Sequence, residues 1–138
     1  MEIKLDHGAY PPERAHSTDA GLDIKSRYGG YVPAKESAIF RTGVHVKLPP
    51  GTAGILISKS GLYTKHDIIS TGLIDHNYQG EIVVKLTNLG GYDYLVGRGE
   101  KITQLVVVPV LFEDVEIVDD LGEETERGTK GFGSTGKY

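Results

Sequence analysis

Short stretches of alternating or β-branched residues recur along the chain, and glycine and proline separate them. Such stretches are typical of β-strands. They are EIKL (2–5), GLDIKS (21–26), AIFRTGVHVKL (38–48), GILIS (54–58), EIVVKLTN (81–88) and DYLV (93–96). Turn signals such as Pro49-Pro50-Gly51 and Gly90-Gly91 lie between them. The pattern predicts an all-β protein, built as a jelly-roll-like antiparallel sandwich or distorted barrel.

Two segments depart from this pattern. Residues 60–66 are the only ones that could form a helix, and we expect that helix to be short. Residues 102–112 (ITQLVVVPVLF) are nearly all apolar, which is typical of a strand buried on both faces. In so small a domain, we expect a neighbouring subunit to cover one of those faces.

The C-terminal segment 119–138 has no packing pattern. It begins with acidic and polar residues and ends in RGTKGFGSTGKY. We therefore expect one domain over 1–138, with 119–138 as a flexible arm. The GxGxxG at 131–136 lacks the strand before it and the helix after it that a dinucleotide site needs. Its composition still suits a nucleotide, because glycines let backbone N–H groups approach phosphate oxygens and Phe132 can lie on a planar base.

Composition narrows the classes of function. The chain has 138 residues, 38% of them hydrophobic, which fits one domain. The absence of cysteine excludes disulfides and thiolate metal sites. A net charge of -4 argues against a nucleic-acid coat, and no segment resembles a leader or a membrane span. We expect a cytoplasmic protein, or one of the host cytoplasm if phage-encoded, with no membrane or direct nucleic-acid partner.

Five short motifs follow one another along the chain. They lie at 20–24 (AGLDI), 59–66 (KSGLYTKH), 72–80 (GLIDHNYQG), 99–105 (GEKITQL) and 127–136 (RGTKGFGSTG). Together they resemble the five signatures of the trimeric dUTPase family, in the family's order and over almost the whole chain. One such motif alone is weak evidence, whereas five in order are strong.

The resemblance implies a jelly-roll subunit in a homotrimer with three shared active sites. In each site, signatures one, two and four come from one subunit, the third from a second, and the tail from the third. The implied reaction is Mg2+-assisted hydrolysis of dUTP to dUMP and pyrophosphate. That reaction keeps uracil out of DNA and supplies dUMP for dTMP synthesis.

The third signature carries the implied chemistry. Asp75 either caps its own turn, which is common for aspartate, or acts as the base that orients and deprotonates the attacking water. The resemblance favours the base, with attack at the α-phosphorus. It also places Tyr78 under the deoxyribose, where no room is left for a 2′-hydroxyl. The uracil edge is expected to bind the hairpin backbone, at Gly72, Leu73, Ile74 and Val83.

The other signatures supply the phosphate and metal contacts that the resemblance implies. Asp23 is the expected magnesium contact, through water, because Mg2+ keeps most of its waters. Ser60 and Gly61 are expected at the phosphates, with Gln104 beside them and Arg127 on the γ-phosphate. From the tail we expect contacts by Phe132, Gly133, Ser134 and Thr135.

Several positions depart from the family pattern. Lys59 replaces the usual Arg, which keeps the charge but loses the bidentate fork. Thr103, Asp67 and Lys130 replace smaller residues and remove no known chemical role. The histidines show no metal spacing, so we assign them to the surface or to packing.

Two other functions are compatible with the same fold. One is a dCTP deaminase-related enzyme, against which the intact Asp75 and Tyr78 signature argues. The other is a phage-type regulatory protein that reuses the fold. An inserted loop between signatures would favour regulation, and the spacing here is compact.

Overall fold

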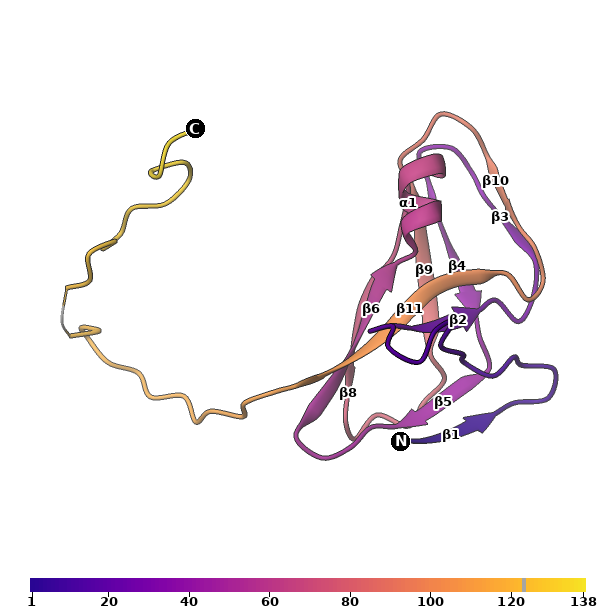
Figure 1. The fold of residues 1–138 in the computed structure, drawn as a ribbon, viewed down its shortest axis with the longest axis horizontal. Helices are drawn as coiled ribbons and strands as arrows, with labels where there is room; N and C mark the ends of the chain where they lie inside the picture. Colours follow the sequence, from indigo (N-terminus) through magenta and orange to yellow (C-terminus); the bar gives the residue numbers. More distant parts are fainter. Residues whose placement is uncertain (123) are drawn as a thin grey trace.

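The computed structural model describes residues 1–122 and 124–138, and within them the chain is mostly β-strand (Figure 1). The elements are β1 (Glu2–Leu5), β2 (Leu22–Lys25), β3 (Gly30–Val32), β4 (Ser37–Arg41), β5 (Val44–Lys47), β6 (Thr52–Ser58), α1 (Ser60–His66), β7 (Ile68–Ile69), β8 (Thr71–Asp75), β9 (Val83–Asn88), β10 (Tyr94–Val96) and β11 (Lys101–Pro109). The helix α1 begins and ends where the sequence predicts.

All strand pairings are antiparallel, and the sheets remain open. The largest sheet has the order β2-β11-β6-β8, and a second has the order β4-β9-β7. Two further pairs, β1-β5 and β10-β3, complete the fold. This arrangement confirms the predicted all-β, jelly-roll-like class. In the largest sheet β8 is an edge strand, so one side of its backbone has no neighbouring strand.

The predicted strand 38–48 is wrong in one respect, because it is two strands. The chain turns at Gly43, whose φ is 66°, a left-handed conformation that glycine adopts without strain. A Cβ at this position would also lie 2.7 Å from the Cβ of Ala9. The break separates β4 from β5 and brings residues 42–45 beside the hairpin that follows β8.

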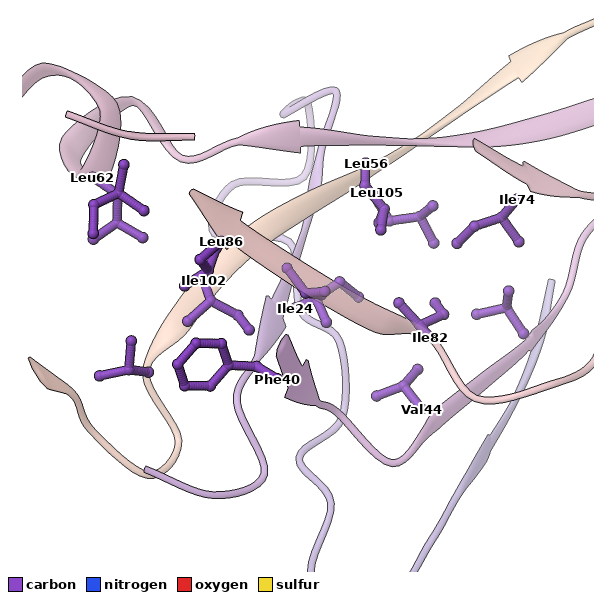
Figure 2. Close-up of a cluster of buried hydrophobic side chains, with 14 of the residues drawn as sticks. Ile24, Phe40, Val44, Leu56, Leu62, Ile74, Ile82, Leu86, Ile102 and Leu105 are labelled. Carbon is purple, nitrogen blue, oxygen red and sulfur yellow. The ribbon is translucent and has the colours of Figure 1, made fainter. Parts of the chain in front are cut away.

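The core lies between the sheets. Ile24, Leu86 and Ile102 are fully buried there, and Phe40 packs in the same cluster (Figure 2). Burial of each such side chain contributes about 1.5–3 kcal/mol. Because β2, β8, β9 and β11 all contribute to this core, it fixes the strand ends that carry the signature residues.

Strand β11 is less buried than the sequence predicts. Ile102, Thr103 and Leu105 are buried, but Val106 to Val108 are only half-buried and Phe112 is exposed. Burial on both faces is therefore not achieved within one chain. A neighbouring subunit over this strand remains a prediction.

Beyond β11 the chain runs away from the sheets (Figure 1). The hydrogen bonds of the described tail are local, such as Arg127 Nε to the Lys130 carbonyl at 3.0 Å. Phe132 is fully exposed. Within the described residues, no helix is long and apolar enough to cross a membrane.

Candidate active site

The hairpin between β8 and β9 holds the third signature. Asp75 is the last residue of β8, and the Tyr78 amide donates to its carbonyl at 3.0 Å. The Tyr78 hydroxyl donates to the Glu81 carbonyl at 3.0 Å. Asp75 is exposed, and its carboxylate accepts no hydrogen bond from the residues that the structure describes. It therefore does not cap its own turn, and it is free to meet a ligand or water.

A cavity of about 240 Å³ opens beside this hairpin. Six of the predicted site residues line it, namely Gly72, Leu73, Ile74, Asp75, Tyr78 and Val83. Leu56 and Ile82 add apolar surface, and both are buried. Since β8 is an edge strand, the cavity combines apolar walls with unpaired backbone groups. That combination suits a flat ring with hydrogen-bonding groups along one edge.

The return limb of the hairpin is tied to residues 41–44. The Ile82 amide donates to the Val44 carbonyl at 2.8 Å, and Thr42 Oγ1 donates to the Ile82 carbonyl at 2.6 Å. The Gly43 amide donates to Glu81 Oε1 at 2.8 Å. These bonds hold the cavity wall formed by residues 81–83 in place.

Glu81 also makes an ion pair with Arg41. Arg41 Nε donates to Glu81 Oε2 at 2.7 Å, and the Glu81 side chain is only 7% exposed. The hydrogen bond from Arg41 lowers the pKa of Glu81; burial opposes the shift, and the Gly43 amide adds to it. The carboxylate is therefore ionised at neutral pH.

A second cavity, of about 390 Å³, is lined by residues of segment 15–21, β2, β6 and β11, and by Lys59. Three predicted residues line it: Asp23, Lys59 and Gln104. Gln104 on β11 is opposite Asp23 on β2 in the strand register. The Gln104 side chain lies over Gly21, where an added Cβ would come within 2.5 Å of its Oε1 atom. The small residue thus lets the amide reach the cavity.

Asp23 is held by two lysines. Lys59 Nζ lies 2.5 Å from Oδ1, and Lys101 Nζ lies 2.9 Å from Oδ2. Lys101 also contacts Glu13 at 3.0 Å. Burial acts to raise the pKa of Asp23, but the hydrogen bonds from Lys59 and Lys101 outweigh it and keep that pKa below its ordinary value. The carboxylate is therefore ionised, and each of its oxygens contacts an ammonium group.

The start of α1 adds donors next to Lys59. Lys59 is the N-cap residue and makes no side-chain cap, and Ser60 and Gly61 are the first helical residues. The first amides of a helix have no partner within it. Apart from its chain neighbours and the helix's own backbone, no atom of the described residues lies within 4 Å of a Cβ built on Gly61, so a ligand can approach its backbone closely.

The predicted site residues form separate groups in this single chain. The cavity of Asp75 and the cavity of Asp23 share no lining residue. The predicted tail residues Arg127, Phe132, Gly133, Ser134 and Thr135 line neither of them. Such separation is what a site assembled from different subunits requires, and that assembly remains a prediction.

Sequence reasoning missed three residues of these sites: Arg41, Glu81 and Lys101. Glu81 directly follows the third signature, and Lys101 lies inside the fourth, so both residues lie in or next to a motif. Their partners are far away in sequence: Glu81 bonds Arg41, and Lys101 bonds Asp23. Local patterns carry no signal for such pairs.

Comparison with known proteins gives one consistent family. A family model described as dUTPase matches residues 9–136. The deoxyuridine 5'-triphosphate nucleotidohydrolase of Clostridium acetobutylicum is 45% identical over 136 residues, which cover 96% of this chain and 93% of that protein. The protein of the same name from Rattus norvegicus is 38% identical, with 98% of this chain and 66% of that protein covered.

Solved structures agree with the sequence relatives. The dUTPase of Staphylococcus bacteriophage 80alpha with dUpNHpp has a TM-score of 0.93 and 32% identity, covering 99% of this chain and 98% of that one. A mutant dUTPase from phage phi11 of S. aureus has a TM-score of 0.80 and 30% identity, covering 87% and 97%. That structure is described as showing how a structural Mg(II) ion is coordinated.

Proposed function

Because this chain belongs to the dUTPase family, we propose that Asp75 is the base of its dUTP-hydrolysing site. The protein is a dUTP diphosphatase: it hydrolyses dUTP to dUMP and pyrophosphate. The observation that carries the role of Asp75 is its free carboxylate at the end of an edge strand, on the rim of the apolar cavity.

The reaction is a displacement at phosphorus. Water attacks the α-phosphorus, its proton passes to the Asp75 carboxylate, and the bond from the α-phosphorus to the oxygen bridging to the β-phosphorus breaks. The leaving group is pyrophosphate. A positioned base typically contributes about a hundredfold to ten-thousandfold to such a rate.

The cavity beside β8 is proposed to hold the nucleoside. The backbone of the edge strand at 72–74 and the backbone of Val83, which line this cavity, are proposed to hydrogen-bond the uracil edge. A base with a different donor and acceptor pattern leaves buried groups unpaired, which makes its rejection strong. Tyr78 closes the sugar end of the same cavity and excludes a 2′-hydroxyl.

The cavity of Asp23 is proposed to hold the phosphates. Lys59 and Gln104 line this cavity and offer an ammonium group and a carboxamide. Ser60 and Gly61 follow Lys59 at the start of α1 and are proposed to add a hydroxyl and free amides. No group of three or more acidic or histidine side chains in the described residues could hold a metal alone. An ionised Asp23 fits Mg2+ that is held mainly by phosphate oxygens and water. When bound, the ion supplies charge stabilisation at the phosphates.

The two cavities are proposed to meet across subunits of a homotrimer. The tail of a further subunit then closes over the nucleotide, with Arg127 at the γ-phosphate and Phe132 on the base. Gly133, Ser134 and Thr135 add phosphate donors. The single-domain boundaries with a 119–138 arm, and a cytoplasmic location, remain predictions.

Pyrophosphate release from each dNTP and from UTP tests this function, with and without Mg2+. We expect release from dUTP alone at a high rate, and a lower rate without Mg2+. Ammonia release from dCTP would instead identify a deaminase. Equal rates on dUTP and UTP would contradict the proposed role of the Tyr78 end of the cavity.

A further inference from the structure

His45 bridges the active-site hairpin to the start of the chain. It lies on β5, and its side chain is 18% exposed. Its Nδ1 atom lies 2.9 Å from the Gln79 carbonyl oxygen, and its Nε2 atom lies 3.2 Å from Asp6 Oδ1. Asp6 in turn has Arg27 Nη1 at 3.6 Å. Both ring nitrogens thus face oxygen atoms that belong to other segments.

The two partners fix the protonation of the ring. A backbone carbonyl and a carboxylate are both acceptors, so each ring nitrogen must be a donor. Only the imidazolium form has a proton on both nitrogens. Either neutral tautomer would point a lone pair at one of the two oxygens. Only a ring protonated on both nitrogens can donate to both oxygens at once.

The surrounding charges are mixed in sign. The acidic residues are Glu2 on β1, Asp6, and Glu81 on the hairpin. The basic residues are Lys4 on β1, Arg27, and Lys47 on β5. Lys4 is opposite His45 in the strand register. Glu81 is occupied by Arg41 and the Gly43 amide, and Glu2 lies 3.5 Å from Lys47. Asp6 is the acid in direct contact with the ring.

Gln79 lies in the hairpin between Tyr78 and Gly80. Its carbonyl belongs to the peptide group that joins Gln79 to Gly80, and the Tyr78 ring lies against the Gly80 backbone. The bonds from residues 42–44 hold Glu81 and Ile82. His45 holds the residue nearest to Tyr78. Rotation of the Gln79 peptide would move the backbone on which the Tyr78 ring rests.

We propose that His45, as the imidazolium, is a positioning residue for the sugar end of the dUTP site. By donating to Gln79 and to Asp6, it fixes the peptide beside Tyr78 and so the ring that excludes a 2′-hydroxyl. The inference rests on the proposed role of Tyr78. A neutral ring has only one N–H donor and can therefore keep only one of the two bonds.

The consequence is a pH-dependent selectivity. Loss of the second ring proton at higher pH is expected to raise KM for dUTP by about 2- to 10-fold, the effect of the net loss of one hydrogen bond. The ratio of kcat/KM for dUTP over UTP should fall in parallel. This ratio cancels every ionisation that affects the two substrates equally.

His45→Asn tests the proposal, since an amide can donate to Gln79 but does not titrate. We expect the variant to show a selectivity ratio that is flat between pH 5.5 and 8.5, whereas the wild type declines. His7→Asn is the matched control, because the His7 side chain is exposed and should leave the wild-type decline unchanged. A decline in His45→Asn equal to the wild type would overturn the proposal.

A second measurement does not depend on activity or on the variant's folding. Proton–nitrogen correlation spectra of the wild-type His45 ring at pH 5.5 should show protons on both nitrogens. A ring with one bare nitrogen at that pH would also overturn the proposal. If the protein released no pyrophosphate from dUTP, the proposed site would fail, and the ring spectrum would still decide whether His45 is an imidazolium.

Discussion

The aromatic ring of Tyr78 lies across the backbone of Gly80. A Cβ added to Gly80 would come within 2.3 Å of the Tyr78 hydroxyl oxygen and 2.4 Å of its Cζ atom. The missing side chain at Gly80 is thus the space that the ring occupies. This contact, together with the bond from the Tyr78 hydroxyl to the Glu81 carbonyl, holds the ring in the lining of the cavity beside β8.

Gly80→Ala should therefore displace the Tyr78 ring and weaken sugar discrimination. We expect the ratio of kcat/KM for dUTP over UTP to fall, by about tenfold if the ring loses interactions worth roughly 1.4 kcal/mol. Gly91→Ala is the control, because a Cβ at Gly91 meets no atom within 4 Å. An unchanged ratio in Gly80→Ala would show that sugar selection does not depend on this contact.

Asp75→Asn should abolish most turnover while leaving dUTP binding intact. The amide keeps the size of the side chain but cannot accept the proton of water, so kcat should fall about a hundredfold to ten-thousandfold. Binding by calorimetry and turnover by pyrophosphate release separate the two effects. Asp114→Asn serves as control, since Asp114 is exposed and outside both cavities. Near-normal turnover would remove Asp75 from the role of base.

Glu81→Gln should change how stability depends on pH. The pKa of Glu81 is lowered by Arg41 in the folded protein, so the folded state favours the ionised form. Its contribution to stability is present above the ordinary carboxyl value of 4.5 and is lost as pH falls through the lower, folded value. The variant should be less stable at pH 7, by about 1–3 kcal/mol for the lost charged acceptor.

As pH falls below 4.5 the difference between Glu81→Gln and the wild type should shrink, and it should vanish once Glu81 is protonated in the folded protein as well. Melting temperatures from pH 3 to pH 8 measure this. Glu2→Gln is the control: the Glu2 side chain is 78% exposed and its contact with Lys47 spans 3.5 Å. If the melting temperatures of Glu81→Gln and the wild type differed by the same amount at every pH, the ion pair would not contribute to the pH dependence of stability.

The sequence predicts those features of this protein that depend on neighbouring residues. The helix at 60–66 and the all-β class follow from local periodicity. Gly72, Asp75 and Tyr78 line one cavity because they belong to the same hairpin. Contacts between distant segments are different. The pairs of Glu81 with Arg41 and of Asp23 with Lys101 join residues brought together only by the packed sheets. Periodicity contains no information on such partners.

The turn at Gly43 illustrates the same limit. Residues 38–48 alternate well enough to form one strand, and a lone glycine does not reveal where such a strand breaks. The break depends on the left-handed backbone there and on the close approach of Ala9, which is a tertiary contact. The break also places the Gly43 amide and His45 where both contact the hairpin that follows β8.

Asp75, Asp23 and the tail lie apart from one another in a single chain. Complementation between two inactive variants can therefore test whether different subunits supply them. If each site takes Asp75 from one subunit and its tail from another, two inactive proteins should restore each other's activity. One is Asp75→Asn, and the other lacks residues 127–138. The second should keep its melting temperature, because the tail's hydrogen bonds are local and Phe132 is fully exposed.

A site in mixed trimers works when its Asp75 comes from a chain without the tail and its tail comes from an Asp75→Asn chain. With equal amounts and random exchange in a closed threefold ring, about a quarter of the sites meet both conditions. Neither parent trimer has any such site. We therefore expect pyrophosphate release to rise from background to about a quarter of the wild-type rate per site once exchange is complete. Subunit exchange is followed independently by mass spectrometry of differently labelled chains. If confirmed exchange leaves the rate at background, Asp75 and the tail of a site belong to one chain or the assembly is not a shared-site trimer.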